Sequence, residues 1–356
     1  MNLSITGKWK TTAAKWPNPN KRMDWISKLT PIFSKIRLNT FLFLLLGAIV
    51  LAWLYPPIGI SEGILHLPKI AGYGVSLIFF FYGAKLSTEQ LLHGIGKWRL
   101  HLAVQLATFL LFPLIILLAR QLFPEYLSSS LGMGIFFLAT LPSTVSSSVV
   151  MVSLAKGDLA SAIFNASISS IIGIFITPLW MSQILVDAQP DFELTHTIGI
   201  LCLQVLAPLI LGLLAHKKLY NWTIRNKNNL QTFDQTVILL IIYTSFCESF
   251  SNDQFGNFAA IEILKLGLLM LLFFLGVFFL MNQLAILFGF KREERITLIF
   301  CGSKKSLVQG AVMGKVLFPN QAILGVVLLP LMIYHALQLL IGSTIAKSMG
   351  AKRDEV

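Results

Sequence analysis

The sequence predicts an all-α polytopic membrane protein with ten transmembrane helices. Of its 356 residues, 55% are hydrophobic and only 12% are charged, and the mean hydropathy is +0.75. A soluble domain cannot bury that much apolar surface. Ten apolar segments follow one another along the chain, and the basic residues between them recur on alternate sides. That alternation is what the positive-inside rule requires of a protein that crosses the membrane repeatedly.

The chain begins with a polar, basic stretch at residues 1–39, which holds eight Lys or Arg residues and one acid, Asp24. We expect a partly disordered cytoplasmic tail that lies on anionic lipid. No apolar stretch precedes the first span, so we expect no cleavable signal.

Ten apolar segments follow this tail and are called spans 1 to 10. They cover residues 40–55, 70–84, 100–123, 131–154, 159–184, 197–215, 233–250, 261–288, 296–318 and 322–346. Spans 1 and 2 are short for a hydrocarbon core about 30 Å thick, so we expect them to extend into their flanks. Residues 347–356 form a second cytoplasmic tail.

The charges between the spans test this layout. The loops after even-numbered spans and the end of the chain are basic, whereas the opposite loops are acidic. This asymmetry predicts that both termini are cytoplasmic, in a bacterial inner membrane. It also explains the net charge of +12 without nucleic acid, because the basic residues do not form one patch. The basic residues are Lys85, Lys97, Arg99, Lys156, Lys217, Lys218, Arg225, Lys227, Lys291, Arg292, Arg295, Lys347, Lys352 and Arg353, and the acids are Glu62, Glu125, Asp187, Asp191, Glu193, Asp253 and Glu262.

Span 9 contains two adjacent lysines, Lys304 and Lys305, about ten residues past its charged start. At about 1.5 Å per residue they lie roughly 15 Å deep, where a lysine costs about 2.5–3.5 kcal/mol on insertion scales. Non-helical backbone at this depth must line a cavity or be buried in protein. The stretch therefore predicts a solute or ion site, the alternative being a short loop outside the membrane. Its other polar or helix-weakening residues are Gly302, Ser303, Ser306, Gln309 and Gly310.

Span 4 carries a similar interruption. Pro142 removes a helix hydrogen bond and is followed by a run of hydroxyl side chains. These hydroxyls either satisfy freed backbone groups and pack, or coordinate a cation. The hydroxyl residues selected as candidates are Ser143, Thr144, Ser147 and Ser148.

A weak repeat relates the two interrupted spans. Ser143 and Ser146 of span 4 correspond to Ser303 and Ser306 of span 9 at the same offset. Five spans separate them, so the two halves have opposite orientation. An inverted five-plus-five repeat with two interrupted spans is typical of secondary transporters.

Span 5 presents a polar stripe, because Ser161, Asn165 and Ser169 recur every four residues on one helix face. We expect this stripe to turn toward span 4. An asparagine at this depth either joins helices by hydrogen bonds or coordinates a hard cation, if it meets Ser147 or Ser148.

The sequence lacks the motifs of the common enzyme classes: there is no H-E-x-x-H, G-x-S-x-G, P-loop or C-x-x-C. Cys202, Cys247 and Cys301 all fall within spans and have no metal spacing, so we expect packing roles. No catalytic residue, metal site or cofactor is predicted.

Five strings are similar to a known family. They are FYGAKLS at 81–87, KWRLHL at 97–102, LPSTV at 141–145, FCGSKKS at 300–306 and LPLMIYH at 329–335. They resemble the bile acid:sodium symporter family (solute carrier family ten), in its member-seven-like branch, over residues 40–346. The resemblance implies ten spans, a panel domain of spans 1, 2, 6 and 7, a core domain of spans 3–5 and 8–10, and broken spans 4 and 9 that cross in the core.

The resemblance also raises a question about coupling. Sodium-coupled members carry a glutamate and a glutamine as sodium ligands in span 9, where this chain has Phe300 and Lys304. In span 4, Ser147 and Ser148 match the polar pair of the family. Sodium coupling is therefore in doubt, and a proton is the other candidate ion.

The function that these observations favour is secondary active, symporter-like transport of an organic anion or related small solute. Partners are the solute and the lipid bilayer, without nucleic acid; the oligomeric state is open. The alternatives are a cation/proton exchanger, and a non-transporting membrane regulator or membrane-bound enzyme. For the lysine pair we expect a division of roles. Lys304 holds the crossing as a tethered cation or loses its proton, and Lys305 faces the solute.

Overall fold

A computed structural model describes residues 40–63, 65–85, 96–124, 129–188, 193–255, 259–318 and 320–351; for residues 186–188 and 260 it describes the backbone alone. The chain divides into two units, Met1–Phe43 and Leu44–Val356. Of the first unit only residues 40–43 are described, at the start of the helix Thr40–Leu54. The basic tail predicted at residues 1–39 lies outside the described residues. All predicted site residues belong to the second unit.

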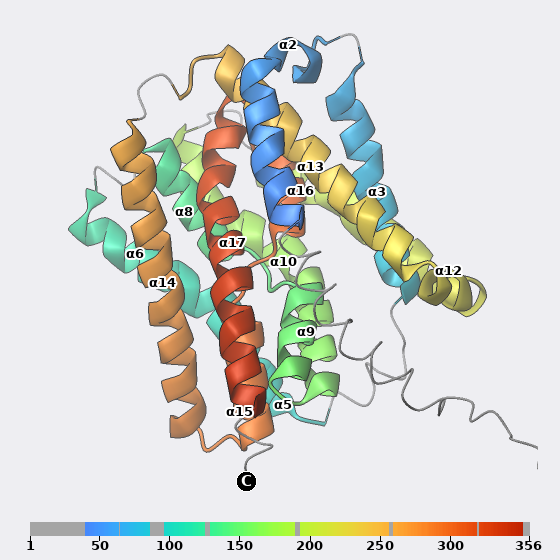
Figure 1. Ribbon diagram of the computed structural model, residues 1–356, viewed down its shortest axis with the longest axis vertical. Helices are drawn as coiled ribbons and strands as arrows, with labels where there is room; N and C mark the ends of the chain where they lie inside the picture. The colour runs from blue at the N-terminus through green and yellow to red at the C-terminus, as the bar shows by residue number, and fades with distance from the viewer. Residues whose placement is uncertain are drawn as a thin grey trace, which may run out of the picture. The chain divides into compact units, whose positions relative to one another are not determined.

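The described residues form helices joined by turns and short loops, without a strand among them. The helices of the second unit, in chain order, are α2 (Pro56–Gly59), α3 (Leu67–Lys85), α5 (Trp98–Leu106), the π-helix η1 (Ala107–Leu111), α6 (Phe112–Leu122), α8 (Ser130–Thr140), α9 (Ser146–Leu154), α10 (Leu159–Ala188), α11 (Leu194–Leu201), the π-helix η2 (Cys202–Leu206), α12 (Ala207–Arg225), α13 (Lys227–Ser251), α14 (Ala260–Leu287), α15 (Arg292–Gly302), α16 (Leu307–Leu317) and α17 (Gln321–Ala351) (Figure 1).

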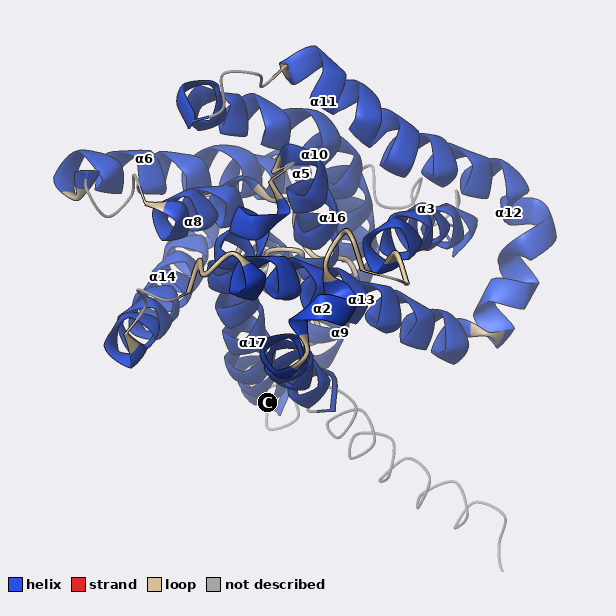
Figure 2. Cartoon of the chain, turned by 90° about the horizontal axis from the view of Figure 1, so that it is seen from above, coloured by secondary structure: helices blue, strands red, loops and turns tan. Residues whose placement is uncertain are grey.

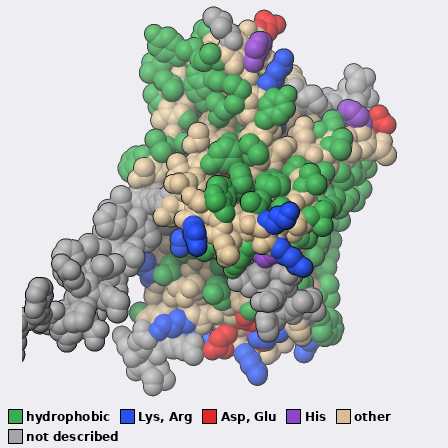
Figure 3. Space-filling view, turned by 90° about the vertical axis from the view of Figure 1, so that its right-hand side faces the viewer, with side chains coloured by type: hydrophobic (Ala, Val, Ile, Leu, Met, Phe, Trp, Pro, Cys, Tyr) green, Lys and Arg blue, Asp and Glu red, His purple; other side chains and the backbone are tan. Residues whose placement is uncertain are grey.

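Seven helical segments in the described part of the chain are long and apolar enough to cross a membrane. Their outer faces are apolar as well: on α14 the exposed residues Leu264, Leu268, Leu272, Leu275 and Phe279 recur at helical spacing. Hydrophobic side chains also cover much of the face in Figure 3. A large exposed apolar surface on long helices is stable in lipid but not in water. The prediction of a polytopic, all-helical membrane protein is confirmed.

The connection between predicted spans 6 and 7 differs from the expectation. α12 continues to Arg225 and α13 begins at Lys227, so the two helices almost meet. Lys217 and Lys218 therefore lie on a helix rather than in a loop. The physical reason is that a helix carries its own backbone hydrogen bonds beyond the last apolar residue, so it need not end there.

Two glycines bring α3 and α12 together backbone to backbone. A Cβ atom added at Gly83 would lie 2.9 Å from the amide nitrogen of Leu213, and one added at Gly212 would lie 2.9 Å from that of Ala84. Small residues at a crossing are how membrane helices approach closely. Figure 2 shows α3 and α12 on one side of the bundle and α6 and α14 on the other.

Three connections and the end of α17 meet at one end of the second unit, where α5, α9 and α15 lie beside the last turns of α17 (Figure 1). Lys97, just before α5, lies 2.9 Å from the carboxylate of Asp158 and 3.2 Å from that of Glu294. Arg292 donates a hydrogen bond to the carbonyl oxygen of Met349 at 2.7 Å. The loops after predicted spans 2, 4 and 8 and the end of α17 thus share one side, as their charges predicted.

Candidate functional site

Both interrupted spans break where the sequence indicated. The helical path stops between Thr140 of α8 and Ser146 of α9, and again between Gly302 of α15 and Leu307 of α16. Pro142 has no N–H and disfavours helical backbone at the residue before it, and Leu141 is extended accordingly. Non-helical backbone buried at this depth must find partners inside the protein.

The two breaks supply partners to each other. The amide of Ser306 donates to the carbonyl of Pro142 at 3.0 Å, and the hydroxyl of Ser143 donates to the carbonyl of Cys301 at 2.6 Å. The hydroxyl of Ser148 lies 3.3 Å from the carbonyl of Phe300. The expectation that the two stretches lie within side-chain reach is confirmed, and these serines satisfy freed backbone groups.

Neighbouring helices complete the hydrogen bonding of the breaks. The amide of Gln338 on α17 bonds both backbone groups of Lys305, at 3.0 and 2.9 Å, and the hydroxyl of Tyr334 donates to the carbonyl of Ser303 at 2.7 Å. From α10, the hydroxyl of Ser169 accepts from the amide of Ser143 at 3.0 Å. Part of the stripe on span 5 therefore turns toward span 4, as expected.

Lys305 is fully buried, and its ammonium group donates to three carbonyl oxygens, those of Thr108 at 2.8 Å and of Ala139 and Leu141 at 2.7 Å each. It also lies 4.1 Å from the centroid of the Phe112 ring, within range of a cation–π interaction. Lys305 was expected to face the solute; in the structure its ammonium donates to carbonyls that the helix breaks leave without backbone donors.

Lys304 is buried too but has weaker partners. Its ammonium group lies 3.5 Å from the carbonyl of Ser147 and contacts the sulfur of Met151. The ring of Phe300 is 5.8 Å away. Among the described residues no carboxylate pairs with it. The tethered cation predicted at Lys304 is thus found one residue later, at Lys305.

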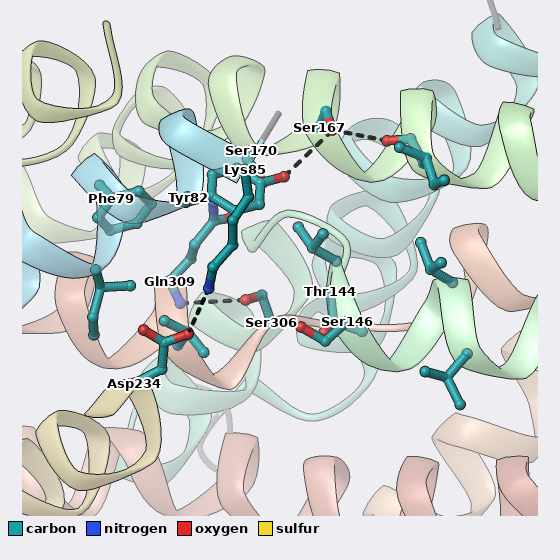
Figure 4. A pocket seen from close by; sticks show the side chains of 16 residues that line it. Phe79, Tyr82, Lys85, Thr144, Ser146, Ser167, Ser170, Asp234, Ser306 and Gln309 are labelled. Atoms are coloured by element: carbon teal, nitrogen blue, oxygen red, sulfur yellow. Dashed lines mark hydrogen bonds and ion pairs between the residues drawn. The ribbon is translucent and has the colours of Figure 1, made fainter. Parts of the chain in front are cut away.

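A cavity of about 440 Å³ opens beside the crossing, between α3 and α13 on one side and α9, α10 and α16 on the other (Figure 4). Three predicted site residues line it: Thr144, Ser306 and Gln309. The other lining residues are Ile78, Phe79, Tyr82, Lys85, Val145, Ser146, Val149, Val150, Ile163, Ser167, Ser170, Asp234 and Val308. The described lining residues are mostly apolar, with one lysine and one aspartate among them.

Two candidates from span 5 lie away from this cavity. The hydroxyl of Ser161 donates to Asp158 at 2.6 Å, at the start of α10. The side chain of Asn165 donates to the carbonyl of Ser161 at 2.9 Å and accepts from Gln105 at 3.2 Å. Asn165 therefore joins α10 to α5. Ser147 lies nearer the cavity and donates to Thr144 at 3.3 Å.

An ion pair in the cavity was not among the candidate site residues. The ammonium of Lys85 lies 3.8 Å from a carboxylate oxygen of Asp234, and Figure 4 shows Lys85 reaching toward it. Nearby, the hydroxyl of Tyr82 on α3 donates to that of Ser167 on α10 at 3.4 Å. The sequence did contain a signal for Asp234: it is an acid at the start of span 7, next to a connection that is otherwise basic.

Comparisons with known proteins place the chain in a transporter family. The model of the SBF-like CPA transporter family matches residues 39–351. The chain is 35% identical to the putative symporter YfeH of Escherichia coli, over 87% of this chain and 92% of that protein. It is 35% identical to an uncharacterized protein of Pseudomonas aeruginosa, over 89% of this chain and 94% of that protein.

A vertebrate relative supports the same assignment. The sodium/bile acid cotransporter 7 of Rattus norvegicus is 31% identical over 89% of this chain and 94% of its own length. The resemblance drawn from the five sequence strings is therefore confirmed. Because the family model spans all of the described residues, the chain belongs to the SBF-like CPA transporter family and is an integral membrane transporter.

Proposed function

We propose that the protein is a symporter-like secondary transporter that carries an organic anion through the cavity beside the crossing. The observation that carries this proposal is the lining of the cavity. It combines residues from both interrupted spans, such as Thr144 and Ser306, with residues from α3 and α13. Sites at the midplane, formed by discontinuous helices, are typical of secondary transporters.

The chemistry of the lining favours an amphipathic anion. Apolar side chains, among them Phe79 and Val149, form most of the wall, and Lys85 is the cation among the described residues that line it. Mostly apolar pockets of about 300–1,000 Å³ with a few placed polar groups are typical small-molecule sites. Relatives named as symporters and bile acid cotransporters support this class of solute.

The candidate residues divide into two groups under this proposal. Thr144, Ser306 and Gln309 contact the solute, with Ser147 behind Thr144. The second group holds the crossing or the start of α10 in shape: Ser143, Ser148, Ser161, Asn165, Ser303, Lys304 and Lys305.

We further propose ten spans in an inverted five-plus-five repeat. The helix Thr40–Leu54 and the two interrupted pairs, α8 with α9 and α15 with α16, add three spans to the seven long helices. The panel domain comprises spans 1, 2, 6 and 7 and moves against a core domain of spans 3–5 and 8–10. The support is that the two breaks are five spans apart and bonded to each other.

Both termini are cytoplasmic in this proposal, in the inner membrane of a bacterium. This proposal is supported by the contacts among the loops after predicted spans 2, 4 and 8 and the end of α17, which lie together at one end of the second unit. The residues that make these contacts are Lys97, Asp158, Glu294 and Arg292. A cysteine at Glu193 should react with an impermeant maleimide added outside cells, and one at Arg225 should not. The reverse pattern contradicts the topology.

The coupling ion is not sodium bound in the way of sodium-coupled relatives. A lysine ammonium already occupies the carbonyl oxygens of the crossing, and Phe300, which packs on Phe278 with ring centroids 5.6 Å apart, offers no ligand. Two cations at close range in a low dielectric repel each other by several kcal/mol. A proton is therefore the proposed coupling ion.

The test is flux in proteoliposomes that contain the purified protein. Cholate uptake should be driven by an inward proton gradient and should persist when sodium is replaced by N-methylglucamine. Thr144→Val should weaken it several-fold, whereas Ser182→Ala, on the outer half of α10, should leave it unchanged. Strict sodium dependence contradicts the coupling proposal. Proton-driven cation flux without cholate uptake favours a cation/proton exchanger instead.

A further inference from the structure

Lys85 and Asp234 form the one ion pair inside the cavity among the described residues, and the pair is loosely held. The closest N–O distance is 3.8 Å, and the two side chains are 29% and 28% exposed. The other carboxylate oxygen of Asp234 is buried without a hydrogen-bond partner among the described residues. Polar atoms that line a cavity and lack a partner mark positions where a ligand can complete the bonding.

A second unpartnered acceptor faces the same space. Gln309 is only 4% exposed, and its side-chain oxygen has no hydrogen-bond partner among the described residues. Gln309 comes from α16 and Asp234 from α13, so two different helices bring the two acceptors to the cavity (Figure 4). The described lining of the cavity therefore offers one cation, Lys85, and two acceptor oxygens without donors, on Asp234 and Gln309.

We propose that the anionic group of the solute replaces Asp234 as the ion-pair partner of Lys85. The unpaired carboxylate of Asp234 then binds one proton from water. The proton and the anion enter together, so Asp234 is the residue that makes the transporter a proton symporter. This inference rests on the proposed function of the cavity as the solute site.

Charge balance supplies the reason. Before the anion binds, the described lining residues carry no net charge, because Lys85 and Asp234 compensate each other. An anion that pairs with Lys85 leaves a second negative charge on Asp234, in a place of low dielectric with no other cation beside it among the described lining residues. An uncompensated carboxylate in such a place is costly, and protonation removes the cost. The charges of Lys85, Asp234 and the solute then sum to zero both with and without the solute.

The neighbours of Asp234 favour a proton over a metal ion. From α9, α10 and α16 the cavity receives only neutral side chains, and from α3 it receives Lys85 and the hydroxyl of Tyr82. On α12, His216 bonds to the carbonyl of Ala84, and on α17, His335 bonds to Gln338. Asp234 is thus the single carboxylate among the described residues of the lining, whereas a bound sodium or calcium ion needs several oxygen ligands.

Infrared difference spectroscopy on the purified protein tests the key step without any solute. Lys85→Gln deprives Asp234 of its cation, as pairing of Lys85 with the solute would. At neutral pH this variant should show the carbonyl stretch of a protonated carboxyl group, and the band should be missing from Lys85→Gln combined with Asp234→Asn. Lys85→Arg keeps the charge and is the matched control without the band. A Lys85→Gln spectrum without this band overturns the inference.

A second arm uses cholate as the probe. Adding cholate to wild-type protein in weak buffer should take up protons from solution, in an amount equal to the cholate bound. Asp234→Asn should still bind cholate, more tightly than wild type because Lys85 has lost its internal competitor, but should take up no proton. Cholate binding to wild type without proton uptake overturns the inference. Failure of cholate to bind contradicts the proposed solute class, and the infrared arm then decides the role of Asp234 separately.

Discussion

The ammonium of Lys305 and the carbonyl oxygen of Thr108 lie 2.8 Å apart, although 197 residues separate them in the chain. This carbonyl is available because of the π-helix η1. There the amide of Phe112 bonds back to Ala107, and the next residue, Pro113, has no N–H to offer. The carbonyls of Ala139 and Leu141 are free for a related reason, since the helix breaks beside them. One lysine therefore donates to three carbonyls that two interruptions of helical hydrogen bonding, at η1 and at the end of α8, leave without backbone donors.

Lys305→Met should strongly destabilise the protein. The substitution leaves three buried carbonyls without a donor, at about 1–3 kcal/mol for each unsatisfied group. Lys304→Met, in which an ammonium with weaker partners is lost, should cost much less. Thermal unfolding in detergent measures both. An equal loss in the two variants contradicts the structural role of Lys305.

Pro113→Ala gives a way to check the origin of the free carbonyl. The new N–H lies five residues beyond Thr108 and can donate to that carbonyl within the π-helix. In combination with Lys305→Met it should recover part of the lost stability, whereas alone it should have a small effect. Absence of any recovery in the double variant means that Thr108 does not need the donor.

The crossing of α3 with α12 should be intolerant of side chains. Gly83→Ala and Gly212→Ala each place a methyl group against backbone atoms of the partner helix, where no flexible side chain can yield. Loss of the close approach should lower the melting temperature markedly. Gly276→Ala on α14 is the matched control. No atom of the described residues lies within 4 Å of its Cβ position, and alanine is the better helix former by about 1 kcal/mol.

The cluster at Asp158 gives a pH dependence of stability. Burial raises the pKa of Asp158, but hydrogen bonds from Ser161 and Lys97 and the charge of Lys97 outweigh it, so the pKa lies below its usual value. The carboxylate therefore stabilises the fold at neutral pH. This contribution is full above the ordinary value of about 3.9 and is lost as pH falls through the lowered value.

The pKa of Lys97 shifts in the opposite direction: it is raised, and the largest cause is the hydrogen bond to Asp158. Its contribution is full at neutral pH and is lost only in strongly alkaline solution. Because Lys97 is 45% exposed, the ion pair is worth about 1 kcal/mol or less. Asp158→Asn should lower the melting temperature at neutral pH, and the difference from wild type should shrink in acid. A constant difference across this range contradicts the assignment.

The contact between Tyr82 and Ser167 should report on movement of the two walls of the cavity. Cysteines at both positions, in a background without the native cysteines, should be joined by a short bifunctional maleimide. Because the link ties α3 to α10, it should block transport. The matched control is a pair within one wall, Tyr82 with Phe79, in which linking should not lower flux below that of the same double-cysteine protein before linking. Full transport by the linked protein contradicts alternating access at this cavity.

Much of the fold could be predicted from the sequence because lipid imposes simple rules on it. Long apolar segments must be helices that carry their own hydrogen bonds, and loop charges mark the sides of the membrane. The breaks at Pro142 and at Gly302–Ser306 were also visible, since proline and buried lysines cannot continue an ordinary apolar helix. These features depend on local composition alone.

The division of labour between Lys304 and Lys305 could not be read from the chain. The two residues are adjacent and chemically identical, and what separates them is the position of carbonyl groups on α8 and η1, far away in sequence. The same holds for the pairing of Lys85 with Asp234, which are distant in the chain and meet only because α3 packs on α13. Sequence determined which segments enter the membrane. Tertiary packing decided which buried charges hold the fold and which face the cavity, because partners at this depth come from other helices rather than from water.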